Sequence, residues 1–217
     1  MSEIFSEIDE DLRRERLHKL WQRYSGLIVG GAIVVVAAVG AWQGYTWWAE
    51  KQAAAASAEF DAAAVLAADN KHAEAEAAFA KLATTAPSGY RGLARLRAAA
   101  EAGDRDPKAG VALYDAIAAD TSMPLVERDI ARVRAGNLLI DHATYADMAS
   151  RLEGAAGAGR PFNHAARELL ALSAWRAKDN AAAQKWLDMI AEDGTTPASL
   201  RQRAEALQAL LPPAAKS

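Results

Sequence analysis

The distribution of hydrophobic positions divides the chain into one long apolar run and a series of shorter amphipathic segments. The apolar run, GLIVGGAIVVVAAVGAWQGYTWW, covers residues 26–48, and no charged residue lies between Arg23 and Glu50. About 20 apolar residues in a helix are enough to cross a bilayer core of roughly 30 Å. The run therefore predicts a transmembrane helix over residues 24–49. Aromatic side chains, which favour the membrane–water interface, lie near its two ends at Tyr24, Tyr45, Trp47 and Trp48.

Basic residues beside the apolar run predict its orientation. The positive-inside rule compares Lys and Arg on the two sides of a span. Lys51 is the one basic residue in the first 20 positions after the run. We therefore expect residues 1–23 to form an amphipathic leader in the cytoplasm. The chain after Glu50 is expected to lie on the opposite side of the membrane. Five basic residues precede the run closely: Arg13, Arg14, Arg16, Lys19 and Arg23.

A cleaved signal peptide is the alternative to a permanent anchor. The alanines at 53–56 could supply a small-residue cleavage site. Against this, the apolar run is longer than the roughly 7–15 residues usual in such peptides, and the leader is long and partly acidic.

Small residues along the apolar run predict a face on which another membrane helix packs. Gly26 and Gly30 lie one helical turn apart, as do Gly40 and Gly44, and Ala37 lies on nearly the same face. Small residues in line let two helices approach closely, either with a partner or with a second copy. The alternative is that glycine and alanine are simply common in membrane helices, and both interpretations remain open.

Prolines then recur at a nearly constant interval. Pro87, Pro124, Pro161 and Pro197 are separated by 37, 37 and 36 residues. A helical stretch with a polar turn inside it precedes each proline, and such self-similarity is typical of a helical solenoid. Proline suits these sites because it ends one helix and is tolerated in the first turn of the next. We therefore expect an all-α chain with helical hairpins over residues 50–211 and a tail over 212–217.

The same periodicity predicts where the helices lie and which residues face inward. The segment from 154 to 160 is glycine-rich, so we expect a loop there. Predicted first helices of the hairpins are 54–68, 90–102, 125–140 and 163–178, second helices are 72–86, 107–120, 144–154 and 180–192, and a last helix is 198–211. Predicted large inward residues are Phe79, Leu82, Leu113, Ile117, Met148, Leu152, Trp186 and Ile190.

Two nearly identical arginine-rich segments begin at Arg91 and Arg128. They read RGLARLRAA and RDIARVRAG, and in each a second arginine, Arg95 or Arg132, follows one helical turn later. Stacked hairpins would align these four side chains into a basic column.

The column has two interpretations. It could line a partner-binding groove, where the planar guanidinium suits carboxylates and carbonyls, with Tyr90 and Trp175 as apolar anchors. Alternatively, the arginines pair with nearby acids such as Glu127 and Asp129 and form an ordinary solvated face.

The composition of the chain limits the kinds of site and partner that we expect. The net charge is −3, which argues against nucleic acid as the main partner, and the absence of cysteine excludes disulfides and thiolate sites. Sequence motifs for a phosphate loop or a nucleophile elbow are missing, so we expect no enzyme activity and no cofactor. Three of the four histidines lie near predicted helix ends or turns, and no metal site is expected; the histidines are His18, His72, His142 and His164.

The hairpin period resembles the tetratricopeptide repeat family over about residues 54–211. Ala100, Ala112, Ala119 and Pro124 match that family's relative order. The interval of 36–37 residues exceeds the family's usual period of about 34, and its signature tryptophan is missing from most units. The resemblance implies that the first helices of the hairpins line the concave surface of the fold.

Taken whole, the chain resembles the YfgM family of ancillary subunits of the bacterial SecYEG translocon. The resemblance rests on the charged leader and on the segments GAWQGYTWW, KQAAAASAEFDAAAVL, PSGYRGLARLRAAAEA and AADTSMPLVERDIARVRAGNLL. It implies an inner-membrane anchor with a periplasmic repeat domain, bound to SecYEG and to a PpiD-type folding factor. The expected role is an adaptor that assists handover of secreted chains. The alternative is a self-associating scaffold in envelope assembly or cell division.

Overall fold

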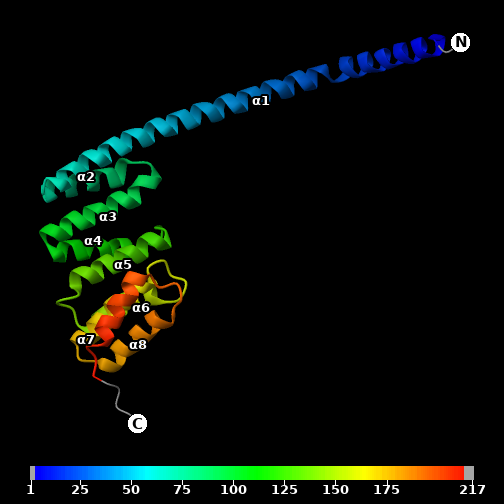
Figure 1. The fold of residues 1–217 in the computed structure, drawn as a ribbon. Helices are drawn as coiled ribbons and strands as arrows, with labels where there is room; N and C mark the ends of the chain where they lie inside the picture. The colour runs from blue at the N-terminus through cyan, green and yellow to red at the C-terminus, as the bar shows by residue number, and fades with distance from the viewer. Residues whose placement is uncertain (1–2, 213–217) are drawn as a thin grey trace. The chain divides into compact units, whose positions relative to one another are not determined.

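The computed structural model describes residues 3–212, and for residues 3–17, 19 and 20 it describes the backbone alone. Two compact units make up the chain, Met1–Ala54 and Ala55–Ser217. The described residues are helical with no strand, which confirms the predicted all-α class (Figure 1). The predicted amphipathic side chains of the leader and residues 213–217 of the predicted tail lie outside the described ones.

Helix α1 runs without interruption from Glu3 to Ala68, over 66 residues. The prediction of a separate helix beginning at residue 54 is therefore wrong. The segment after Glu50 is rich in alanine and contains neither glycine nor proline, so nothing in it ends a helix. Over Trp21–Ala68, α1 is the one described helix that is long and apolar enough to cross a membrane.

The second unit continues as antiparallel hairpins in which successive helices pack on one another (Figure 1). Apart from the start of the first helix, each boundary lies within three residues of its predicted place. After α1 the helices are α2 (His72–Thr85), α3 (Ser88–Arg105), α4 (Pro107–Ala119), α5 (Leu125–Leu139), α6 (Tyr145–Ala156), α7 (Asn163–Arg176), α8 (Asn180–Glu192) and α9 (Ala198–Gln208).

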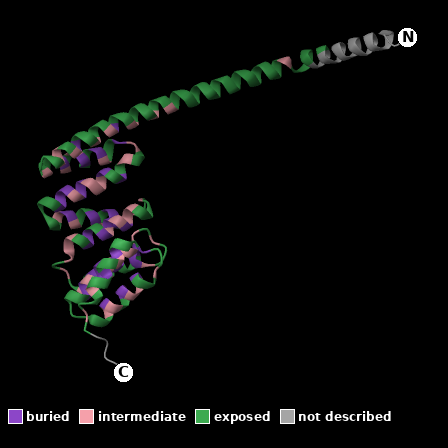
Figure 2. Cartoon of the chain, viewed as in Figure 1, coloured by how far each residue is buried: buried purple, intermediate pink, exposed green. Residues whose placement is uncertain are grey.

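Alanines and a few large side chains form the core of the hairpins. Figure 2 shows the buried residues gathered where neighbouring hairpin helices face each other. Small alanine side chains let the helix axes approach closely, and larger residues from the second helices fill the remaining space. Seven of the eight predicted inward residues are buried: Phe79, Leu82, Ile117, Met148, Leu152, Trp186 and Ile190.

The eighth prediction, Leu113, is wrong, because α4 is rotated from the expected orientation. Leu113 is 39% exposed, and Tyr114, at 4%, is buried instead. The inward face of α4 carries Gly110, Tyr114 and Ile117 at helical spacing. Gly110 lies directly against the backbone of Gly103 in α3, and this close approach of two glycines determines which face of α4 turns inward.

The glycine-rich segment is a loop only from residue 157. Helix α6 continues through Gly154 to Ala156, two residues beyond its predicted end at 154. Ala155 and Ala156 are fully buried, and their packing holds the last turn of the helix despite the glycine. The loop that follows contains Gly159 with a positive φ of 75°, a conformation that glycine adopts without strain.

Candidate partner-binding surfaces

At each junction between hairpins, an arginine near the start of the following first helix donates through its side chain to a backbone carbonyl at the end of the preceding second helix. The last carbonyls of a helix have no partner within it, and they form the negative end of its dipole. We call these residues the capping arginines. Their bonds join Arg91 to Ala86 (2.7 Å), Arg128 to Ala118 (3.1 Å), Arg167 to Ala156 (2.9 Å) and Arg201 to Asp193 (3.3 Å).

Register explains why the capping arginines recur. In three of the four hairpin junctions the arginine follows the helix-starting proline by four residues, which points its side chain back over the junction. At the third junction the same offset falls on Ala165. There α7 begins only at Asn163, and Arg167, which is buried, caps α6 in its place. The arginine series is interrupted in the sequence at Ala165, but the bond from an arginine to the end of the preceding helix is still made.

The second arginine of each repeated segment pairs with an acid. Arg95 donates to the Asp120 carboxylate at 2.7 Å. Arg132 donates to Asp129 at 2.8 Å and also to the Ala118 carbonyl at 3.2 Å. These contacts agree with the acid-pairing interpretation of the column. That the same arginines also bind a partner segment stays a prediction.

Asp120 and Asp193 occupy equivalent turns, one after α4 and one after α8. The Asp120 carboxylate accepts bonds from the Ser122 hydroxyl (2.6 Å), the Ser122 backbone N–H (3.0 Å) and Arg95. The Ser122 hydroxyl, followed by Arg95, lowers the pKa of Asp120 to about 2. Asp193 accepts the same two bonds from Thr195 and one from Arg167, and its pKa is held well below its usual range.

These two carboxyl groups predict a loss of stability in acid. Because their pKa values are lower in the folded state, the unfolded chain takes up protons first as the pH falls. Their stabilisation is complete above about pH 4, the ordinary pKa of Asp. We expect the free energy of unfolding, measured by urea denaturation, to fall from there towards pH 2, and to fall less steeply in Asp120→Asn. Asp61→Asn, at an exposed helical position, is the control, and equal slopes in both variants would contradict the assignment.

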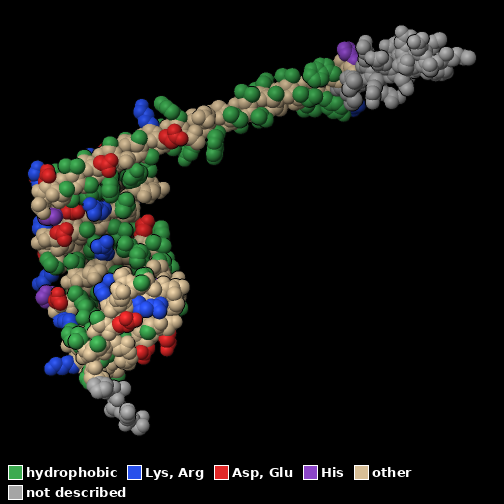
Figure 3. Space-filling model, in the orientation of Figure 1, with side chains coloured by type: hydrophobic (Ala, Val, Ile, Leu, Met, Phe, Trp, Pro, Cys, Tyr) green, Lys and Arg blue, Asp and Glu red, His purple; other side chains and the backbone are tan. Residues whose placement is uncertain are grey.

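An apolar groove crosses α2, α3 and α4. It encloses 260 Å³, and Leu113 of α4 lines it, which accounts for the exposure of that side chain. Arg95 of α3 also lines it, and a role for this arginine in partner binding stays a prediction. In Figure 3, acidic and basic side chains are interspersed among the hydrophobic ones on the visible face of the hairpin helices. The other lining residues are Glu76, Ala80, Ala83, Ala98, Ala116 and Ile117.

The two predicted aromatic anchors lie in different parts of the hairpin domain. Tyr90 of α3 is half-buried, with its ring centroid 6.3 Å from that of Phe60. Trp175, near the end of α7, is 36% exposed. Helices α3 and α7 are not in contact within the described residues, so the anchors do not form one site.

The predicted membrane-helix packing face is open in the first unit. A Cβ built at Gly26, Gly30, Gly40 or Gly44 would meet no described atom within 4 Å. Ala37 is exposed as well. Space for a second helix is therefore available along this face, and its use stays a prediction.

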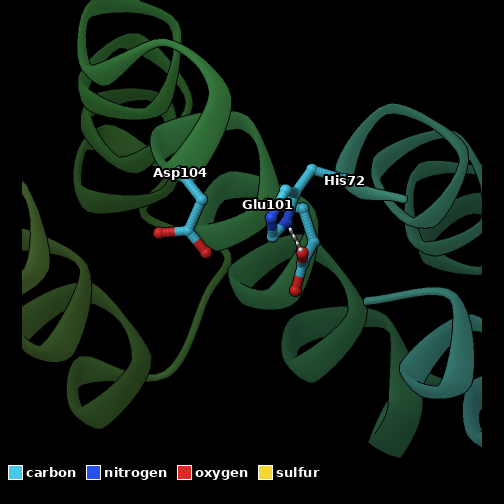
Figure 4. A group of neighbouring side chains, drawn as sticks. All are labelled: His72, Glu101 and Asp104. Atoms are coloured by element: carbon cyan, nitrogen blue, oxygen red, sulfur yellow. Dashed lines mark hydrogen bonds and ion pairs between the residues drawn. The ribbon is translucent and has the colours of Figure 1, made fainter. Parts of the chain in front are cut away.

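One group of described side chains has the types that bind a metal ion. His72, Glu101 and Asp104 each present a ligand atom, and these atoms lie within 4.8 Å of one another (Figure 4). Sequence spacing did not indicate this group, because 29 residues separate His72 from Glu101.

Stacked antiparallel hairpins with alanine-lined contacts, following an apolar helix of membrane length, define a helical-repeat protein of the interaction class. The model of the tetratricopeptide repeat-like domain matches residues 18–169, and the chain belongs to this family. Comparison with curated proteins and with solved structures gave no match. Repeat domains of this kind are typically non-catalytic scaffolds whose extended surfaces bind other proteins, so the fold indicates a protein–protein interaction adaptor.

Proposed function

We propose that the protein is a single-pass inner-membrane adaptor whose hairpin domain lies in the periplasm beside the Sec translocon. The observation that carries this proposal is the combination in one chain of a membrane-length apolar helix and an interaction domain. The basic residues before the span support a cytoplasmic N-terminus. The resemblance to the YfgM family supports SecYEG and a PpiD-type folding factor as partners.

Tethering is the proposed mechanism. An anchor that holds a binding domain near the translocon exit raises the effective concentration of that domain for its partners, without any new contact. The groove across α2, α3 and α4 and the exposed edges of the arginine column are the surfaces that the hairpin domain offers to folding factors or emerging chains. The face bearing Gly26, Gly30, Gly40 and Gly44 is the surface that the span offers to the translocon.

A pull-down from native membranes in mild detergent tests this proposal. The intact chain is compared with a variant in which residues 26–48 are replaced by an unrelated apolar span of equal length. We expect translocon subunits to co-purify with the native span and to be lost with the replacement. Recovery of the protein itself or of division factors with both spans, without translocon subunits, would contradict the Sec assignment and favour a self-associating scaffold.

A further inference from the structure

The antiparallel α2–α3 hairpin brings three metal-ligating side chains together at its open end. His72 is the first residue of α2, and Glu101 and Asp104 lie one turn apart near the end of α3. Because the two helices run in opposite directions, the start of one meets the end of the other. The His72 Nδ1 atom lies 2.9 Å from the Glu101 Oε2 atom, and Asp104 projects from the next turn (Figure 4).

Glu101 carries a largely buried carboxylate. The residue is 4% exposed, and among the described residues its side chain has one hydrogen-bond partner, the His72 imidazole. A buried carboxylate is costly unless its charge is compensated. The His72 imidazole donates one N–H to this carboxylate. A metal cation bound between the two side chains would compensate the carboxylate charge directly.

Nearby arginines do not supply that charge through an ion pair. Arg97 lies 5.5 Å from the centre of the Phe79 ring, and Arg105 is paired with Glu76 at 2.7 Å. No described arginine is within ion-pair distance of Glu101 or Asp104.

Tyr114 of α4 lies near the same group of side chains. The residue is 4% exposed; its hydroxyl makes no hydrogen bond to a described residue, but its oxygen still reaches solvent. Burial raises the pKa of the Tyr114 hydroxyl; Arg134 and Arg97 lower it, and the negative charges of Asp104 and Glu101 raise it. The Tyr114 hydroxyl therefore lies in the field of the two carboxylates and of two arginines.

We propose that His72, Glu101 and Asp104 bind one Zn²⁺ ion. Zinc bonds to imidazole nitrogen and carboxylate oxygen are about 2.0–2.2 Å long, which places ligand atoms of a tetrahedral site about 3.3 Å apart. The nitrogen and oxygen that now share a proton need to separate by only a few tenths of an ångström. Asp104 is exposed and free to turn inward, and water completes the fourth position.

The ligand set favours zinc over the hard cations. Mg²⁺ and Ca²⁺ prefer oxygen ligands alone, whereas an imidazole with carboxylates suits Zn²⁺. Bound there, the ion joins α2 to α3 and stabilises the folded hairpin by mass action. This site does not depend on the proposed translocon partner.

Isothermal titration of the full-length, His-tag-free protein in mild detergent with ZnCl₂ tests the site, with MgCl₂ as the cation control. We expect one Zn²⁺ per chain, with at least tenfold weaker binding in Asp104→Asn and none that saturates in His72→Ala. Glu153→Gln and His142→Ala change exposed residues of the same types and should bind as the unaltered chain does.

Asp104→Asn is the decisive variant, because Asp104 is exposed and its replacement leaves the core intact. Thermal unfolding gives a second readout: ZnCl₂ should raise the Tm of the unaltered chain, EDTA should reverse the rise, and Asp104→Asn should show a smaller one. Absence of saturable zinc binding would overturn the proposal. Equal affinity in Asp104→Asn would overturn it as well, because the ion would then be adventitious.

Discussion

Gly110→Ala is expected to destabilise the hairpin domain by about 1–3 kcal/mol, the cost of overpacking a close helix contact. A Cβ at this position would lie against the Cα of Gly103, 2.7 Å from the Gly103 nitrogen and 3.1 Å from the Ala99 carbonyl oxygen. All three are backbone atoms, which cannot rotate away as a side chain would. Helices α3 and α4 would have to separate, and the tight contact would be lost along their length.

Gly154→Ala is the matched control. Gly154 also lies inside a helix, α6, but a Cβ there meets no described atom within 4 Å. Alanine is the better helix former by up to about 1 kcal/mol, so this variant should be slightly stabilised. Urea denaturation followed by circular dichroism compares the two. Equal stability of Gly110→Ala and Gly154→Ala would show that the close approach of α3 and α4 does not exist.

Asp129→Ala is expected to cost about 3 kcal/mol, because removing one partner of a buried ion pair leaves the other charges uncompensated. Asp129 is fully buried, and its Oδ1 atom accepts from Arg132 at 2.8 Å and from Arg160 at 2.6 Å. The value is at the lower end of the range because both arginines keep some contact with water. Arg160 lies in the loop after α6, so the variant also releases that loop.

The loop supplies a readout that separates this effect from a general loss of stability. Cleavage by subtilisin within the loop at residues 157–162 under native conditions should be faster in Asp129→Ala, because the Arg160 guanidinium no longer holds the loop against α5. Glu153→Ala, on the exposed side of α6, is the control and should change neither stability nor cleavage. Unchanged cleavage together with unchanged stability would mean that the Asp129 contacts contribute nothing.

The helices could be predicted from the sequence because their signals are local. Proline at the start of a helix and apolar residues at helical spacing act within a few positions, and the observed boundaries follow them closely. The rotation of α4 could not be predicted in this way. It depends on Gly103 and Gly110 meeting across two helices, and alanine-rich helices carry too few large residues to fix a face by pattern alone.

The sequence indicated only part of what the arginines do. Their repetition was plain in the sequence, but their partners are carbonyls at the ends of other helices, which no side-chain pattern marks. The constant offset of four residues from Pro87 to Arg91 and from Pro124 to Arg128 was the available signal. The meeting of His72 with Glu101 likewise required knowledge that α2 and α3 are antiparallel.

Cysteine accessibility tests most directly the central claim that α1 holds an interaction domain across the membrane from its N-terminus. The chain has no cysteine, so Ser6→Cys and Glu153→Cys each introduce a single thiol. In spheroplasts treated with a membrane-impermeant maleimide, we expect labelling of Glu153→Cys before lysis and of full-length Ser6→Cys only after lysis. Three results would contradict this topology. Ser6→Cys alone could be labelled before lysis, both thiols could be protected until lysis, or Glu153→Cys could be released in a soluble, shortened form.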